Sequence, residues 1–271
     1  MGMDIERAAD DESGGVAGIV GRRALQLVSA GREQYSVLVR TMYYVARGKM
    51  EGGVLARQMY EIGNRSLFLL TVVMGFIGTI LVLQAGLQTR RVVPDLSMLG
   101  ASYLELLVRD LSASIVALML ATRVGAGIAA EIGSMVVTEQ VDALRMCAAD
   151  PIDYLVKPRF LASIVMTTVL TIWSGGVSIV TGMITADVVF QVAPKTFWNL
   201  SLVHASDLFI CLVKCLAYGA AIPVVSATSG LSTFGGSEGV GWATTKAVVN
   251  SSLAVIILNF LISSAGLIAF S

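Results

Sequence analysis

Residues 66–87, SLFLLTVVMGFIGTILVLQAGL, contain no charged side chain. An α-helix needs about 20 predominantly apolar residues to cross the hydrocarbon core of a bilayer, and this stretch is long enough. The composition agrees, since 55% of the residues are hydrophobic and only 14% are charged, whereas a soluble domain carries about 25% charged residues. The mean hydropathy is +0.78. The chain is therefore expected to fold in a membrane.

Four further stretches are candidate spans: residues 96–121, 160–190, 208–228 and 247–270. The second span, residues 96–121, carries Glu105, Arg109 and Asp110, and the fourth span, residues 208–228, carries Lys214. Ionisable side chains at membrane depth are costly, so they are usually paired or functional. Mutual neutralisation of Glu105, Arg109 and Asp110 is the plain alternative to a functional role. The sequence thus predicts an all-α integral membrane protein with about five transmembrane helices.

The region before the first span divides into a tail and amphipathic stretches. Residues 1–19 are polar with several acidic groups, and we expect them to form a disordered cytosolic tail. Between residues 20 and 65, apolar side chains recur at helical spacing opposite arginines, which is typical of a helix lying in the membrane interface. An ordinary docked helix of a soluble domain is the alternative. Residues 66–271 are assigned to the transmembrane domain.

The orientation follows from the basic residues, because loops rich in Lys and Arg stay in the cytoplasm. With a cytoplasmic N-terminus, only Arg90, Arg91 and Lys195 fall on the far side. Arg109 and Lys214 fall within spans, and the remaining Lys and Arg residues are cytoplasmic. The C-terminus is then expected on the side away from the cytoplasm.

The cytoplasmic loop between the second and third spans, about residues 123–159, has two features. Small residues four positions apart at its start predict close approach of another helix; they are Ala121, Gly125, Ala129 and Gly133. A short polar helix follows, with Glu139, Gln140, Asp142 and Arg145. Asp150-Pro151 then resembles a helix start. A folded loop suits either a coupling element that transmits a partner's motion or a simple surface helix.

Several chemistries are excluded by what the chain lacks. Cys147, Cys211 and Cys215 have too few neighbouring ligands for a metal site, and His204 is the only histidine. No G-x-x-x-x-G-K-[ST] run occurs, so the chain has no P-loop for nucleotide. The glycine-rich run FGGSEGVG at residues 234–241 is expected to be a flexible connection. A neutral net charge gives no reason to expect a nucleic-acid partner.

The loop also carries a specific motif, E-I-G-x-M-x-x-T-E-Q-x-x-A-L-x-x-x-x-x-D-P-x-x-Y-L-x-x-P-R. This run closely resembles the MlaE (YrbE) family, the permeases of bacterial ABC transporters that move lipids for MCE-domain proteins. VLARQMYEIGNRSL, VLQAGL and ATTKAVVNSSLAVIILNF look like other segments of the family. The similarity covers the chain from about residue 52 to the C-terminus, with several separated motifs in the same order.

The resemblance implies a multi-pass homodimeric permease in the bacterial inner membrane, with an N-terminal elbow helix and five spans. Implied partners are a second permease copy, cytoplasmic ATPase subunits that hold ATP and Mg, an MCE-domain protein and a phospholipid or related lipid. The chain itself needs no cofactor and is not expected to be an enzyme.

Site residues are implied in the same way. The polar helix with Glu139, Gln140, Asp142 and Arg145 would be the coupling helix that docks into the ATPase. Gln84, Arg109 and Asp110 would line the lipid cavity, and Lys214 matches a family lysine in the fourth span. The sequence departs from the family where Asp110-Leu111-Ser112-Ala113 replaces Glu-Leu-Gly-Pro, and where Ala148 replaces a glycine. Loss of Gly and Pro is expected to straighten the second span.

Two other classes of function remain as alternatives. A stand-alone secondary carrier would be expected to show internal repeats, and none is evident. A lipid-modifying membrane enzyme would need a catalytic cluster, but the chain has one His and no G-x-S-x-G. Within the permease class, a sterol or a fatty acid is the alternative substrate.

Overall fold

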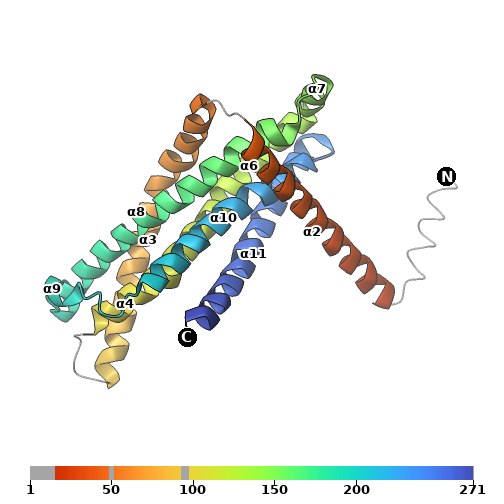
Figure 1. Ribbon diagram of the computed structural model, residues 1–271. Helices are drawn as coiled ribbons and strands as arrows, with labels where there is room; N and C mark the ends of the chain where they lie inside the picture. Colours follow the sequence, from red (N-terminus) through yellow and green to blue (C-terminus); the bar gives the residue numbers. More distant parts are fainter. Residues whose placement is uncertain (1–15, 49–51, 93–97, 271) are drawn as a thin grey trace.

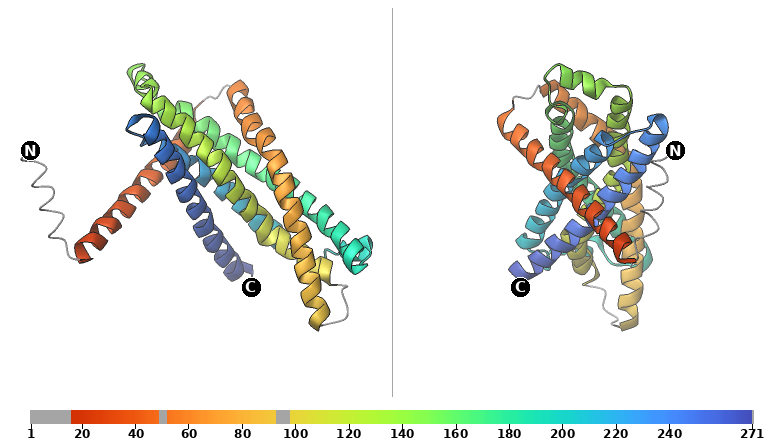
Figure 2. Two further views of the ribbon diagram at one scale, coloured as in Figure 1. Left: turned by 180° about the vertical axis from the view of Figure 1, so that it is seen from behind. Right: turned by 90° about the vertical axis from the view of Figure 1, so that its right-hand side faces the viewer.

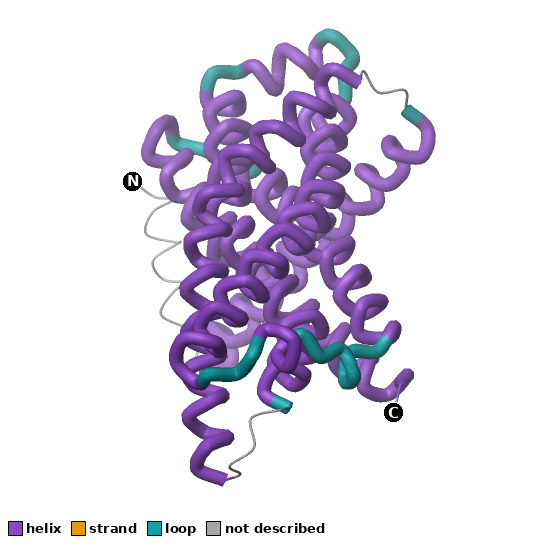
Figure 3. Tube along the Cα trace, turned by 90° about the vertical axis from the view of Figure 1, so that its left-hand side faces the viewer, coloured by secondary structure: helices purple, strands orange, loops and turns teal. Residues whose placement is uncertain are grey.

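The computed structural model describes residues 16–48, 52–92 and 98–270, and every regular element in these ranges is a helix. Five are long and apolar enough to cross a membrane: Gly53–Arg91, Leu99–Val137, Ile152–Phe190, Ala205–Leu231 and Gly236–Ala269. They pack in one bundle (Figure 1). Figure 3 shows the loops gathered near the two ends of this bundle. The prediction of an all-α membrane protein with five spans is confirmed.

Helix α2, Val16–Arg47, precedes the bundle. It begins four residues earlier than the start expected at residue 20, and residues 1–15 of the expected tail lie outside the described ranges. Its contacts are with η3, α8 and α10, and Figure 2 shows its N-terminal half projecting away from the bundle. The helix is therefore anchored to the spans mainly through its C-terminal half.

Helix α3, Gly52–Val92, is one continuous helix. The boundary drawn between residues 65 and 66 falls inside this helix, so the amphipathic stretch and the first span share it. The stretch contains no proline, and Arg57 and Glu61 support it with an i,i+4 ion pair of 3.4 Å. Residues four apart, including Leu70, Met74 and Val82, are buried.

Helix α8, Lys157–Phe190, packs along α3 and follows the π-helical turn η3, Ile152–Val156. Its buried face is built largely from small polar side chains: Ser163, Thr167, Thr171, Ser174, Ser178 and Thr185. Thr171 donates to the carbonyl oxygen of Thr167 at 2.8 Å, so its hydroxyl group is satisfied within the helix. Small residues let helix backbones approach closely in lipid, where no hydrophobic force draws apolar helices together.

The second span is formed by a continuous series of helical segments: α4 (Leu99–Leu106), η1 (Leu107–Leu111), α5 (Ser112–Leu120), η2 (Ala121–Gly125) and α6 (Ala126–Val137). The first part of the region expected as the cytoplasmic loop, residues 123–137, is thus helical and continuous with the second span. No proline lies between residues 99 and 137, and the small side chains there pack in the bundle instead of turning. The π-helical turns η1 and η2 interrupt the regular α geometry.

The remaining elements are α7 (Gln140–Met146), α9 (Pro194–Phe197), α10 (Ala205–Leu231) and α11 (Gly236–Phe270). Helix α11 begins well before residue 247, so the flexible connection expected at residues 234–241 was wrong from Gly236 onward. A buried cluster including Leu70, Val116, Leu170 and Tyr218 joins the spans. In Figure 1, α7 and the α10–α11 turn lie at one end of the bundle, and α9 and the C-terminus lie toward the other.

Candidate functional site

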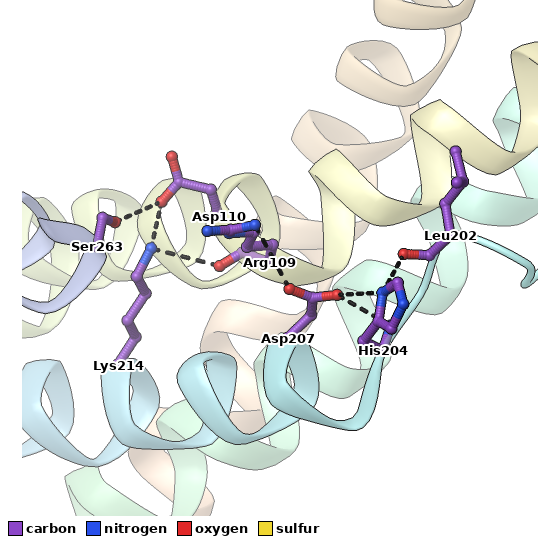
Figure 4. Close-up of polar contacts among 7 residues, drawn as sticks. All are labelled: Arg109, Asp110, Leu202, His204, Asp207, Lys214 and Ser263. Atoms are coloured by element: carbon purple, nitrogen blue, oxygen red, sulfur yellow. Dashed lines mark hydrogen bonds and ion pairs between the residues drawn. The ribbon is translucent and has the colours of Figure 1, made fainter. Parts of the chain in front are cut away.

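Four charged side chains meet between the second and fourth spans, and we call them the charge ladder: Arg109, Asp110, Asp207 and Lys214 (Figure 4). Arg109 Nη1 lies 3.8 Å from Asp207 Oδ1. Lys214 Nζ pairs with Asp110 Oδ1 and also donates to the carbonyl oxygen of Arg109 at 3.3 Å. The adjacent residues of η1 thus pair with two residues that lie seven positions apart on α10.

The ladder does not follow the alternative in which Glu105, Arg109 and Asp110 neutralise one another. Arg109 and Asp110 instead pair across to α10, and no ion pair of Glu105 occurs among the residues that the structure describes. The side chain of Lys214 is 0% exposed and pairs with Asp110. In lipid such a buried ammonium group needs a partner, and the Asp110 carboxylate supplies it.

The two pairs differ in their environment. Lys214 is fully buried and its partner Asp110 is 40% exposed, whereas Asp207 is 5% exposed and its partner Arg109 is 37% exposed. Ser263 of α11 adds a donor to Asp110 Oδ1 at 3.4 Å. Arg109 lines a pocket of about 360 Å³ together with Glu105, His204 and Asp207. Arg109 can therefore reach a ligand in this pocket while it stays paired.

Local backbone geometry helps to place these groups. The π-helical turn η1 contains both Arg109 and Asp110, and such turns break the α-helical hydrogen-bond pattern and occur often at functional sites. The second span was expected to be straighter because it has Asp110-Leu111-Ser112-Ala113 in place of the family's Glu-Leu-Gly-Pro. The π-helical turn overlaps the start of this run, so the helix is not a regular α-helix there. On α10, Asp207 accepts the backbone N–H of His204 at 2.9 Å, which fixes its carboxylate at the helix start.

Gln84 lies apart from the ladder. Among the described residues it has no hydrogen bond to Arg109 or Asp110, and its side chain is exposed on α3. It continues an exposed apolar stripe spaced by four residues, which contains Phe68, Val72, Phe76 and Ile80. Within a single chain, Gln84 is therefore not brought together with the other two expected cavity residues, Arg109 and Asp110.

The small-residue stripe lies inside the bundle. Ala121 and Ala129 are 0% exposed, and α6 packs against both α10 and α11. A Cβ atom added to Gly125 would lie 2.9 Å from Ser226 Oγ, and one added to Gly133 would lie 2.8 Å from Thr233 Oγ1. The absence of side chains at these positions allows the helices to approach this closely.

Residues 138–150, which we call the coupling segment, reverse the chain at the end of the second span. Glu139 and Ala148 both have left-handed backbone conformations, with φ of 60° and 59°, and they bracket α7. Val141 is buried, while Gln140, Asp142 and Arg145 are exposed. Arg145 pairs with Asp142 at 2.9 Å. The segment is thus a short folded helix with an exposed charged face, at one end of the bundle (Figure 1).

Ala148 stands where the family usually has glycine, and its backbone has a left-handed conformation that favours glycine. Glycine adopts positive φ without a Cβ clash, whereas an L-residue incurs about 1–2 kcal/mol. We expect Ala148→Gly to raise the free energy of unfolding by up to about 1 kcal/mol, since the flexibility of glycine in the unfolded chain offsets part of the gain. Thermal unfolding in detergent measures this change in stability. Ala149→Gly, at a neighbouring residue without positive φ, should lower stability, and equal effects of both variants would contradict this explanation.

Contacts at the base of the coupling segment were not predicted. The Tyr44 hydroxyl of α2 donates to Asp150 Oδ2 at 2.7 Å, and Asp150 Oδ1 accepts the backbone N–H of Ile152 at 2.9 Å. The hydrogen bond to the Asp150 carboxylate raises the pKa of Tyr44 above its ordinary value. Arg159 of α8 pairs with Glu131 of α6 at 2.8 Å. The Tyr44–Asp150 contact ties α2 to the segment, and the Arg159–Glu131 pair joins α8 to α6.

The sequence contained one signal for the missed ladder partner. Asp207 and Lys214 are seven residues apart, and this spacing places them on one face of a helix, with charges complementary to Arg109 and Asp110. Ser263, Tyr44 and Glu131 had no such signal. Among the described residues, no cluster of three or more His, Cys, Asp or Glu side chains is arranged to hold a metal ion.

The comparisons with known proteins agree with one another, because the matching family model and the curated relatives below include permeases. The model of the permease MlaE family matches residues 55–265. A probable ABC transporter permease protein of Synechocystis is 36% identical over 81% of this chain and 84% of its own length. A probable ABC transporter permease protein of Rickettsia bellii is 32% identical over 92% of this chain and 96% of its own length. The chloroplastic protein TRIGALACTOSYLDIACYLGLYCEROL 1 of Arabidopsis thaliana is 32% identical over 81% of this chain and 63% of its own length.

The match covers all five long apolar helices, at least in part, together with the charge ladder and the coupling segment. The chain is a multi-pass membrane protein and a transport subunit rather than a catalytic enzyme. It belongs to the MlaE family of ABC transporter permeases.

Proposed function

We propose that the protein is the membrane half of an ATP-driven transporter that moves phospholipids or related lipids between the bacterial inner membrane and an MCE-domain carrier. The N-terminus would be cytoplasmic and the C-terminus periplasmic, as the distribution of Lys and Arg favours. ATP and Mg would be held by a separate ATPase subunit. A lipid as cargo agrees with the name of the Arabidopsis relative, which is also that of a lipid, trigalactosyldiacylglycerol.

The observation that carries the proposal is the folded coupling segment at the end of a long continuous helix series. A rigid helix can pass a partner's motion into the spans, whereas a slack loop cannot. Helix α7 exposes Gln140, Asp142 and Arg145, and Glu139 begins it, so these residues would contact the ATPase. The second span would then carry the motion directly to Arg109 and Asp110, because α6, α5 and η1 are continuous with one another.

The lipid chamber would form between two copies of the chain. The exposed stripe of α3 with Phe68, Phe76 and Gln84 offers an apolar wall with one polar group. Within a membrane span such a stripe is suited to contact acyl chains, and Gln84 is its polar exception. Arg109 and Asp110 would contribute charge to the chamber, with Arg109 accessible from its pocket.

The double substitution Glu139→Lys/Arg145→Glu tests the coupling role. It reverses the exposed charge pattern and breaks the Asp142–Arg145 pair. We expect about tenfold weaker association with the separately encoded ATPase, equivalent to ~1.4 kcal/mol, and loss of transport-coupled ATP hydrolysis. Co-purification and ATPase assays in nanodiscs measure both effects.

Two controls sharpen this experiment. Lys195→Glu reverses an exposed charge on α9, toward the other end of the bundle, and should leave association unchanged. Exchanging Asp142 and Arg145 keeps an internal ion pair, so it separates loss of helix stability from loss of surface recognition. Unchanged ATPase association and activity in the Glu139→Lys/Arg145→Glu variant would refute the coupling role. Mass spectrometry of lipids retained by the complex would distinguish a phospholipid from a sterol or a fatty acid.

A further inference from the structure

A second pocket, of about 550 Å³, lies where α10 turns into α11. This volume is in the range of small-ligand sites, about 300–1,000 Å³. Its walls include Ser229 and Thr233 of the α10 side and Glu238, Trp242 and Lys246 of α11. In Figure 1 this turn is at the end of the bundle that carries α7. The pocket is therefore well separated along the bundle from the His204 end of α10, where the other pocket lies.

Two large aromatic side chains at this pocket are exposed: Phe234 by 85% and Trp242 by 72%. Tryptophan is enriched at the level of lipid headgroups, where its ring meets both apolar and polar surroundings. Trp242 lies in the first turns of the apolar helix Gly236–Ala269, near the end of the bundle, so its exposed ring is suited to this depth. The aromatic pair thus indicates that the pocket opens toward the membrane interface.

Charges in the pocket lie in a definite order along α11. Glu238, Trp242 and Lys246 are spaced by four residues, so they share one face of the helix, at intervals of about 6 Å. Glu238 is nearest the end of the bundle and Lys246 is deepest. Neither Glu238 nor Lys246 forms an ion pair among the described residues. Because helical side chains lean toward the N-terminus, Lys246 can extend its ammonium group back toward Trp242.

An apolar track continues from Lys246 toward the membrane centre on the same face. Val249, Leu253, Ile257 and Phe260 follow at helical spacing, and all are at least half exposed. Read from the centre outward, the α11 face offers apolar surface, then a cation, then an interfacial aromatic ring, then an anion. A zwitterionic phospholipid presents its acyl chains, its phosphate and then its ammonium group in the complementary order.

We propose that this face binds a membrane phospholipid with a primary ammonium headgroup, such as phosphatidylethanolamine. Lys246 contacts the phosphate, Glu238 accepts hydrogen bonds from the ammonium group, and the acyl chain lies along Val249 and Leu253. Hydrogen bonds between ionised groups are the strong ones, and a choline headgroup has no N–H to donate to Glu238. The site is distinct from the charge ladder and needs no ATPase, so its failure would leave the proposed transport function standing.

Quenching of Trp242 fluorescence tests the proposal directly. The sequence has three tryptophans, so Trp173→Phe/Trp198→Phe leaves Trp242 alone. The full chain is placed in phosphatidylcholine nanodiscs that contain brominated phosphatidylethanolamine, phosphatidylglycerol or phosphatidylcholine. Half-maximal quenching should need about tenfold less phosphatidylethanolamine than either other lipid. Glu238→Gln should remove the preference over both, and Lys246→Glu should weaken phosphatidylethanolamine binding. Lys195→Glu, far from the pocket, should change nothing.

Each other result would overturn the proposal. Equal quenching by the three lipids means ordinary annular lipid, and unchanged selectivity in Glu238→Gln and Lys246→Glu means that these charges do not read the headgroup. Absence of quenching by any lipid means that protein covers this face, either a second copy of the chain or the ATPase. Native mass spectrometry of the tryptophan-complete chain gives an independent readout, because both charge variants should retain less phosphatidylethanolamine than the parent.

Discussion

Replacing Lys214 with methionine should lower the free energy of unfolding by about 3 kcal/mol. Removing one partner of a buried ion pair typically costs about 3–5 kcal/mol, because the other charge is left uncompensated. The lower end applies here, since Lys214 is 0% exposed but Asp110 is 40% exposed and partly screened. The carbonyl oxygen of Arg109 also loses its contact with Lys214. Thermal unfolding in detergent should show Tm lower by about 5–10 °C.

The control is the double variant Asp110→Asn/Lys214→Met. It removes both charges and should recover much of the stability, because replacing a whole buried pair with neutral groups is often tolerated. Lys195→Met removes a surface lysine of α9 and should have no effect on Tm. If the double variant were as unstable as Lys214→Met, the loss would come from packing around Lys214 rather than from an unpaired carboxylate.

The two pairs of the ladder are therefore suited to different tasks. The Lys214–Asp110 pair involves three elements, because Ser263 of α11 also contacts Asp110. This pair therefore stabilises the packing of α10, α11 and η1. Arg109–Asp207 is longer, at 3.8 Å, and Arg109 is 37% exposed at the pocket with Glu105 and His204. A guanidinium group has five N–H donors, so Arg109 can bind an anionic group without leaving Asp207. Of the ladder residues, Arg109 is thus the best placed to contact an anionic ligand in this pocket.

The spans could be predicted because lipid leaves few alternatives. Each backbone polar group must be satisfied within the segment, so an apolar run of sufficient length has to be helical. The charge-free run at residues 66–87 and the run at residues 247–270 both lie within helices, α3 and α11. Hydropathy finds where a helix is buried in lipid, but it is insensitive to where a helix continues into water. For this reason the continuity of α3 through residues 65 and 66 and the first turns of α11 were not predicted.

Pairings between helices were harder to predict than the helices. Arg109, Asp110 and Lys214 were recognised as costly in lipid, but their sequence neighbours suggested partners on the same helix. Which helix faces η1 depends on the packing of small residues, and this information is distributed over many positions of α8, α10 and α6. The π-helical turn η1 adds a local change in register that no residue type marks. The cross-helix partner Asp207 therefore emerged only with the structure.

Replacing Gly219 with alanine should lower the free energy of unfolding by about 2–3 kcal/mol, in the upper part of the range for overpacked cores. Gly219 is buried on α10 where this helix meets α8. An added Cβ would lie 2.7 Å from Ile164 Cα and 3.1 Å from the Ser163 carbonyl oxygen. These are backbone atoms of α8, so no side-chain rotation can relieve the clash. The helices must separate, and this displaces Lys214, which lies little more than one turn away on α10.

Gly176→Ala in α8 is the matched control, because an added Cβ there would have no neighbour within 4 Å. Its stability should be unchanged or slightly higher, since alanine favours helix more than glycine does. Both variants add one methyl group inside a spanning helix, so the difference between their Tm values isolates the α8–α10 contact. Equal Tm values would show that α10 does not approach α8 this closely. A large loss for Gly219→Ala together with weaker ATP-driven transport would instead link this contact to the position of the charge ladder.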